Sequence, residues 1–259
     1  MAGSIGSTNE DADRLFATLI GPSLCPSEWL LRVHPLAPWT DRQRAEWLGL
    51  IAEGFIRLAA VGGLCGERGS PTAMGFAGDV DVYDVDGAME WQFGRLAVDP
   101  GAASLLLNLC DWGALHIAPA AAVEVLGHAL PAGPEPQDRP LPRRTARLSF
   151  ALDESGPAGE DAAIQAEFVR EPNSAEAEQI RRLLRPWYNA LLRWGFALPS
   201  LPTGSSEVLP ADPPLLVVGE LWCYRFERFV ARHEAIEVFL NCLERIHHVV
   251  CPLRCVAIE

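Results

Sequence analysis

Four aspartates alternate with valines in one short run, GDVDVYDVDG, at residues 78–87. Carboxylates placed this closely are groups that bind hard cations or transfer protons, so the run raises the question of a metal site or acid–base chemistry. An EF-hand calcium loop needs glycine at its sixth position, and counting from Asp79 that position is Asp84. The twelfth residue is Glu90, but no helices are expected beside the run. The pattern therefore excludes an EF-hand.

The alternation itself is typical of a β-strand with one face in water. Asp79 and Asp81 each stand next to valines, the pattern then slips, and an Asp-Gly pair follows. A slip indicates a bulge or the start of a turn, and Asp-Gly is a strong signal for a hairpin. We therefore expect Asp79 and Asp81 to face solvent from a strand, and Asp84 and Asp86 to lie at the turn. Solvated carboxylates keep ordinary pKa values, so no catalytic pair is predicted.

Two interpretations of the run are preferred over a metal or catalytic site. Charges on an edge strand prevent aggregation between sheets, so the cluster is explained without any ligand. The same charges would also form a contact surface for a cationic partner, because opposite charges steer association. Under the second interpretation, the predicted partner-binding residues are Asp79, Asp81, Asp84, Asp86 and Glu90.

The composition narrows the class of ligand. The 21 basic residues are all arginine, and the absence of lysine excludes Schiff-base chemistry and a phosphate-binding loop that depends on lysine. The formal net charge is −13, which repels phosphates, so we expect no nucleic acid and a basic protein as partner. A glycine-rich stretch at residues 61–71 follows an expected helix, which indicates a connection rather than a phosphate cradle. No cofactor is predicted.

The cysteines favour a reducing compartment. There are seven, an odd number with irregular spacing, and the first residues are acidic where a secretion signal would be basic. No apolar run reaches the length that a membrane helix needs. We therefore expect a cytoplasmic protein with buried free thiols and no membrane contact.

One group near the C-terminal end has the side chains that zinc prefers: His247, His248, Cys251 and Cys255. A structural zinc site needs four ligands that converge on one point. Cys251 precedes a proline in an expected loop, whereas Cys255 lies in an expected strand. Buried structural cysteines are the preferred interpretation, and no metal site is predicted.

The chain matches itself in a gapless register, which we call the repeat register, that places positions 11–126 over 144–259. The segment EWQFGRLAV then lies over CYRFERFVA. Identical residues in this register include Phe93/Phe226, Arg95/Arg228, Leu107/Leu240, Asn108/Asn241, Gly62/Gly195 and Pro119/Pro252. We interpret the chain as a tail (1–10), a first repeat (11–126), a proline-rich linker (127–143) and a second repeat (144–259).

Each repeat shows the same order of periodic segments. In the first we expect a strand at 29–35, a helix after Thr40, paired strands at 74–83 and 88–98, a helix at 101–115 and a strand at 120–125. In the second we expect a strand at 163–171, a helix from Asn173 or Ser174, paired strands at 214–222 and 223–231, a helix at 234–248 and a strand at 254–259.

The order strand, helix, strand, strand, helix, strand resembles the ferredoxin-like βαββαβ unit. The predicted fold class is α+β, a tandem duplication of this unit with two antiparallel sheets, each covered by two helices. We expect the halves to stack their open sheet faces or to dock side by side.

Charge distinguishes the two repeats. The first has 15 acidic residues and 7 arginines, a net −8, whereas the second has 16 and 12, a net −4. The excess of the first lies near residues 79–90. Since the chain lacks a catalytic signature, we expect a non-enzymatic binding protein that captures a basic partner, such as a bacterial inhibitor or immunity-type neutraliser of a toxin.

The alternative hypothesis is an enzyme with a small-molecule pocket between the sheets of the two halves. Its lining would include His34, Arg95, Arg228 and Glu167, whose spacing favours no particular reaction. RNA binding, which other paired ferredoxin-like proteins perform, is disfavoured by the acidity and by the absence of a basic stripe.

Overall fold

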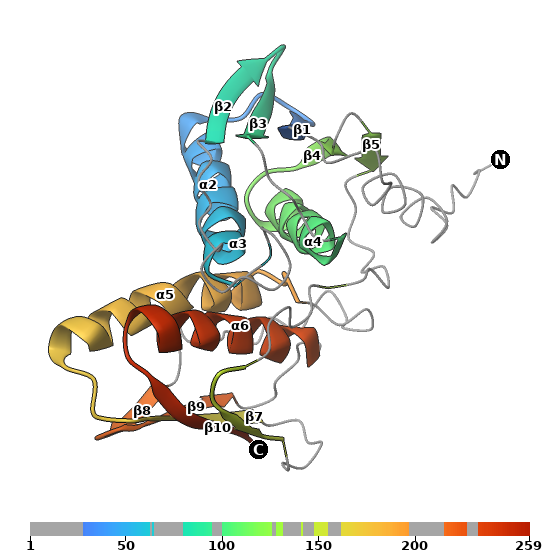
Figure 1. The fold of residues 1–259 in the computed structure, drawn as a ribbon. Helices are drawn as coiled ribbons and strands as arrows, with labels where there is room; N and C mark the ends of the chain where they lie inside the picture. Colours follow the sequence, from blue (N-terminus) through green and yellow to red (C-terminus); the bar gives the residue numbers. More distant parts are fainter. Residues whose placement is uncertain are drawn as a thin grey trace.

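The protein combines helices with two separate β-sheets. The structure, a computed structural model, describes residues 28–62, 64, 80–94, 100–125, 128–131, 141, 148–154, 162–196, 215–226 and 233–259. Within these residues each sheet has five strands, and helices cover one face of each sheet (Figure 1). The expected mixture of helices and strands is therefore observed.

The first sheet has the strand order β2-β3-β1-β4-β5, with neighbouring strands antiparallel. In chain order the elements are β1 (Glu28–Pro35), α2 (Asp41–Ile51), the π-helix η1 (Ala52–Ile56), α3 (Arg57–Val61), β2 (Val80–Val85), β3 (Ala88–Gly94), α4 (Pro100–His116), β4 (Ala120–Val125) and β5 (His128–Pro131). The sequence did not predict strand β5, which lies within the expected linker. This strand pairs with β4.

The second sheet has the order β6-β10-β7-β9-β8. Its half of the chain contains β6 (Ala151–Asp153), β7 (Ala162–Phe168), α5 (Ser174–Leu192), β8 (Leu215–Val218), β9 (Leu221–Phe226), α6 (His233–Val249) and β10 (Leu253–Ile258). Strand β6 was also not expected, and it pairs in parallel with β10. The other strand pairs of this sheet are antiparallel.

Corresponding elements of the two halves follow the repeat register. The helices α4 and α6, the strands β3 and β9, and the strands β4 and β10 all begin at positions that this register superimposes. Strand pairing follows it as well, since Leu31 faces Trp91 in the first sheet and Ile164 faces Tyr224 in the second. The predicted position of the turn in the second hairpin was wrong. The turn lies at residues 219–220, whereas the sequence predicted it after residue 222.

Capping residues start the two long helical segments at the expected positions. The Thr40 hydroxyl accepts a hydrogen bond from the Gln43 N–H, and the Gln43 side chain accepts one from the Thr40 N–H. Asn173 and Glu176 form the same reciprocal pair before α5. Such capping boxes satisfy N–H groups that have no partner within the helix, so both predicted helix starts are confirmed.

Alternation along the strands directs apolar side chains toward the helices. Leu31 and Val33 of β1 are fully buried in the hydrophobic core, whereas Arg32 and His34 lie on the opposite face. The second sheet repeats the pattern, with Ile164, Ala166 and Phe168 of β7 buried. Each sheet therefore has one face under helices and one outer face.

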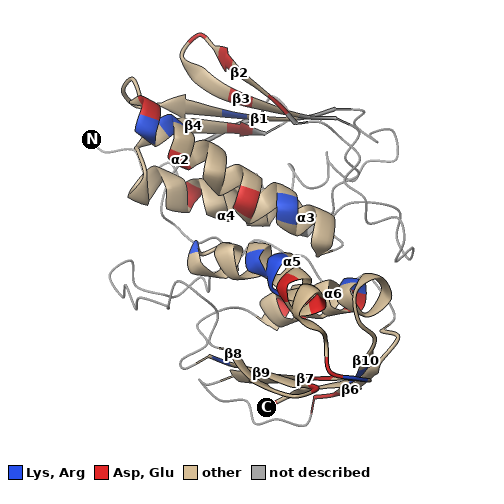
Figure 2. Cartoon of the chain, turned by 90° about the vertical axis from the view of Figure 1, so that its left-hand side faces the viewer, with Lys and Arg blue, Asp and Glu red and all other residues tan. Residues whose placement is uncertain are grey.

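The halves meet through their helices. Helix α5 packs against η1 and α3, and α6 also contacts α3. The two sheets lie at opposite ends of the molecule with the helices between them (Figures 1 and 2). This arrangement corrects the expectation that the halves stack their open sheet faces or dock side by side. The helices carry apolar residues on more than one side, and burying the second side removes it from water.

Two glycines allow close approach between the halves. A Cβ atom added to Gly62 would lie 3.0 Å from Val238 Cγ1, and one added to Gly195 would lie 3.2 Å from Leu105 Cδ1. The repeat register relates these two contacts, because it places Gly62 over Gly195 and Leu105 over Val238. The Asn108 side chain also donates a hydrogen bond to the Gly195 carbonyl oxygen at 3.1 Å. Positions that the repeat register superimposes thus make equivalent contacts where the halves touch.

We expect Gly62→Ala to reduce the free energy of unfolding by about 1–3 kcal/mol, since overpacking a filled contact costs roughly that much. The added methyl group would lie 2.9 Å from the Leu58 carbonyl oxygen as well as close to Val238. Urea unfolding monitored by tryptophan fluorescence measures the change.

Gly49→Ala is the matched control, because nothing lies within 4 Å of the carbon it adds. Alanine also favours a helix over glycine by about 0.5–1 kcal/mol, so this variant should gain stability. Equal stabilisation of both variants would show that the contact at Gly62 does not constrain the fold.

Candidate functional site

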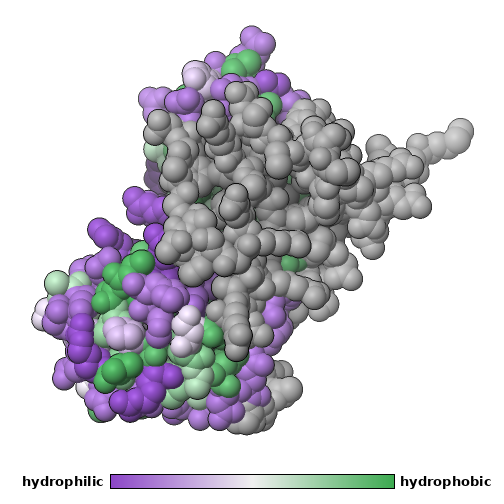
Figure 3. Space-filling view, in the orientation of Figure 1, coloured by the Kyte–Doolittle hydropathy of each residue, from purple (hydrophilic) through white to green (hydrophobic). Residues whose placement is uncertain are grey.

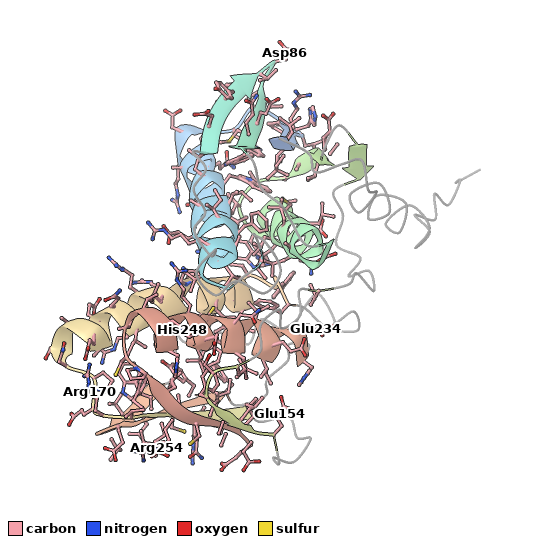
Figure 4. All side chains as sticks on the ribbon, viewed as in Figure 1. Asp86, Glu154, Arg170, Glu234, His248 and Arg254 are labelled. Carbon is pink, nitrogen blue, oxygen red and sulfur yellow. The ribbon has the colours of Figure 1, made fainter. Side chains whose placement is uncertain are left out.

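The acidic run forms the β2–β3 hairpin, which projects from the top of the first half in Figure 1. Asp86 and Gly87 have positive φ angles of 52° and 81°, as a two-residue type I′ turn requires. Asp86 stands at the tip of the hairpin (Figure 4). The predicted Asp-Gly hairpin turn is therefore confirmed.

The aspartates of the run have different surroundings. Asp81 and Asp86 are exposed, and within the described part of the chain their carboxylates make no hydrogen bond or ion pair. Asp84 lies within β2 instead of in the turn, and it pairs with Arg44 of α2. The hydrogen bond from Arg44 lowers the pKa of the Asp84 carboxyl. Asp79 lies outside the described residues.

Apolar side chains stand beside the free carboxylates. Val82 and Tyr83 are 41% and 46% exposed. Strand β2 contains acidic residues and no basic one (Figure 2), and the surface around the hairpin tip is mostly hydrophilic (Figure 3). A surface that combines charge with an aromatic ring is typical of protein contact sites, since charge steers the partner and the ring supplies contact area.

Glu90, the fifth predicted contact residue, is 4% exposed and does not join the other carboxylates at the surface. It faces Arg32 across the β1–β3 pair and accepts hydrogen bonds from the guanidinium group. Gln92 donates a further hydrogen bond at 2.7 Å. The bond from Gln92 lowers the pKa of Glu90 most, burial opposes this change, and Arg32 adds to the lowering.

Arg32 extends this contact into a row of charges on the outer face of the first sheet. Its Nη1 atom donates a hydrogen bond to Glu124 of β4 at 3.1 Å. His34 Nε2 lies 2.8 Å from the other Glu124 oxygen, although the angle does not suit a hydrogen bond. The Arg32 guanidinium group therefore binds the carboxylates of both Glu90 and Glu124. These contacts link the strands β3, β1 and β4. With its charge balanced in this way, Arg32 is a poor site for an additional anion.

The four zinc-type residues near the C-terminal end do not form a metal site. Cys251 is fully buried, Cys255 lies partly exposed on β10, and His247 Nδ1 accepts a hydrogen bond from the Leu253 N–H at 3.0 Å. Burial raises the pKa of both thiols, which disfavours the thiolate that zinc requires. Among the residues that the structure describes, no group of three or more potential ligands is placed to hold a metal ion.

A serine, a carboxylate and a histidine meet in the second half, and sequence reasoning missed them. The Ser149 N–H and hydroxyl donate hydrogen bonds to the two Glu244 oxygens at 2.9 and 2.6 Å. His248 Nε2 lies 2.8 Å from Glu244 Oε1 and 3.2 Å from Ser149 Oγ. Burial would raise the pKa of Glu244, but the bonds from Ser149 and His248 outweigh it and lower the pKa.

This group does not have the geometry of a catalytic triad. A triad places the acid and the serine on different ring nitrogens of the histidine, whereas both contact Nε2 here. The contacts instead fix the segment before β6 to helix α6. The i,i+4 spacing of Glu244 and His248 was visible in the sequence, but Ser149 lies 95 residues from Glu244.

Two of the four residues of the alternative enzyme hypothesis, His34 and Glu167, lie in different sheets. His34 lies on the outer face of the first sheet, and Glu167 of β7, which pairs with Arg254, lies in the second sheet. Since the sheets stand at opposite ends of the molecule, these two side chains cannot line one pocket, and a pocket elsewhere between the halves stays a prediction. Arg95 and Arg228 lie outside the described residues.

Neither a family model nor a curated protein sequence matches the chain. Functional hypotheses therefore rest on the geometry of the surfaces. Among the helices that the structure describes, none is long and apolar enough to cross a bilayer.

Glu90→Gln should lower the free energy of unfolding at pH 7 by about 1–3 kcal/mol, because it weakens charge-assisted hydrogen bonds to a buried group. The pKa of Glu90 is lowered in the folded protein, so its contribution to stability is complete above its ordinary pKa. The contribution is lost as the pH falls through the lower, folded-state pKa. The difference between wild type and variant should therefore shrink on acidification.

Urea unfolding at several pH values measures this difference. Asp81→Asn is the control, because a solvated and unpaired carboxylate should change stability by less than about 0.5 kcal/mol. A deficit of the Glu90 variant that persisted unchanged into strong acid would show that packing, and not charge, causes it.

Proposed function

We propose that the protein is a non-enzymatic binding protein that captures a basic protein partner through the β2–β3 hairpin. The observation that carries the proposal is the exposure of Asp81 and Asp86, whose carboxylates have no partner within the described residues. Unpaired charges on a projecting hairpin meet an approaching partner first, and they steer it over distances of about a Debye length.

The contact surface consists of Asp81, Val82, Tyr83 and Asp86. The two carboxylates would pair with arginine or lysine side chains of the partner, and Tyr83 would supply aromatic contact area. Asp84 acts indirectly, because its ion pair with Arg44 holds β2 against α2. The predicted role of Glu90 is given up in this proposal, since a carboxylate engaged by Arg32 cannot also meet a partner.

We also infer that both halves are ferredoxin-like βαββαβ units that arose by duplication. The inference is supported by the strand orders β2-β3-β1-β4 and β8-β9-β7-β10, which correspond strand by strand. It is also supported by the glycine contacts between the halves, which the repeat register relates to each other.

The second half supports the functional assignment as an internal comparison. The positions that correspond to Asp84 and Asp86 are Val217 and Gly219, so a hairpin with a two-residue turn also forms there without these carboxylates. Because the fold does not need the acidic run, the charges of the first half serve another purpose. Protection of an edge strand needs charge only on the strand, whereas Asp86 stands beyond it at the tip.

An inhibitor or immunity-type neutraliser of a basic toxin is the kind of protein that this surface suits. Neutralisation depends on rapid capture, and electrostatic steering raises association rates more than it raises affinity. The free cysteines among the described residues suit a reducing cytoplasm, where such a protein would protect its own cell.

Affinity purification of the tagged full chain from its source cells, followed by mass spectrometry, should recover a basic protein. For that partner, the double variant Asp81→Asn/Asp86→Asn should slow association by about tenfold at low ionic strength and change dissociation much less. Stopped-flow kinetics over a range of salt concentrations measures both rates.

The matched control is Glu171→Gln/Glu178→Gln, which makes the same change of net charge on exposed residues of the second half. It should leave the association rate nearly unchanged. Equal slowing by both double variants would mean that total charge matters and the hairpin does not, and recovery of no basic protein would remove the proposal's main support.

A further inference from the structure

Strand β8 is an apolar strand at the edge of the second sheet. Its sequence, LLVV, contains no charge, and among the described strands it has one neighbour, β9. Leu216 and Val218 are 63% and 62% exposed on the outer face of this sheet. Apolar residues also show among hydrophilic ones on the second half in Figure 3. Proteins usually protect such edges with charge, because an open edge pairs readily with another strand.

The backbone of β8 is directed so that it can pair again. A two-residue turn joins β8 to β9, and Gly219 in that turn has a φ angle of 58°, as the first position of a type II′ turn requires. In such a hairpin Val218 and Leu221 form the first hydrogen-bonded pair, so Leu216 and Val218 direct their N–H and C=O groups toward β9. The backbone groups of Leu215 and Val217 are then directed toward the open edge.

We propose that two copies of this chain pair through β8, antiparallel and about a two-fold axis at Val217. In this pairing Leu216 of each copy faces Val218 of the other, on the outer face, which covers the two most exposed residues of the strand. The pairing uses the backbone groups of Val217 that point outward. It joins the two five-stranded sheets into one continuous sheet across the dimer.

The charged residue of the turn does not obstruct this pairing. Glu220, the second turn residue, lies on the β9 side of the hairpin, where its carbonyl oxygen accepts a hydrogen bond from the Phe168 N–H of β7 at 2.9 Å. The open edge of β8 therefore presents the apolar side chains of the strand to a second copy.

The equivalent edge of the first half excludes the same pairing. There, Asp84 occupies the position that corresponds to Val217, so a two-fold pairing of β2 would place Asp84 against its own copy. Like charges directly opposite each other destabilise a strand pair. Of these two edges, β8 is therefore the one that can accept a second copy.

Light scattering coupled to size-exclusion chromatography should give a mass twice that of the 28.2-kDa chain for the full-length protein at high concentration. Leu216→Asp should shift the protein to the monomer. Tyr83→Asp, the same change at the corresponding position of β2, should leave the dimer intact. Circular dichroism measures whether both variants are folded.

Val217→Pro tests the backbone pairing without adding a charge. It removes the N–H group directed toward the open edge and leaves the β8–β9 hydrogen bonds in place, so it should raise the dimer dissociation constant by roughly tenfold or more. A wild-type protein that stays monomeric, a higher oligomer, or a dimer unaffected by Leu216→Asp would overturn the proposal. If Leu216→Asp does not fold, a dimer unaffected by Val217→Pro would overturn it in the same way.

Discussion

The contact between the two helical layers is the constraint on which the rest of the structure depends. Each layer covers a sheet on one side and the other layer on its opposite side. Gly62 and Gly195 permit this contact, because a side chain at either position would press on Val238 or Leu105 from the other half. Since the helices are buried between the two sheets, the outer sheet faces and the edge strands are the surfaces that can contact other molecules.

Features that depend on neighbouring residues could be predicted from the sequence. The caps at Thr40 and Asn173 and the turn at Asp86 each follow from a few adjacent side chains. The burial of Glu90 could not be predicted, because it depends on Arg32, which is 58 residues away. The docking of the halves was also missed, since both helices and sheets have apolar faces and periodicity does not say which faces meet. The uniform LLVV of β8 lacks the alternation that would have placed the second hairpin correctly.

The corresponding edge strands of the two halves, β2 and β8, have opposite surface properties. In the first half, Asp81 and Asp84 make the edge strand too polar to pair with another sheet, and Asp84 also forms an ion pair with α2. In the second half, the exposed Leu216 and Val218 leave apolar surface in water. The free energy of this exposed surface is unfavourable unless another chain covers it. A few side-chain differences thus separate a polar edge from an apolar one, although both hairpins have a two-residue turn, of type I′ in the first half and of type II′ in the second.

The placement of the sheets at opposite ends has a consequence for valency. In two chains joined at β8 the outer faces form one face of the continuous sheet, so both helical layers and both acidic hairpins lie on its other side. Each such dimer could bind two cationic partners on that side. A target with several copies on one assembly would then be held by avidity, with a lifetime longer than a single hairpin allows.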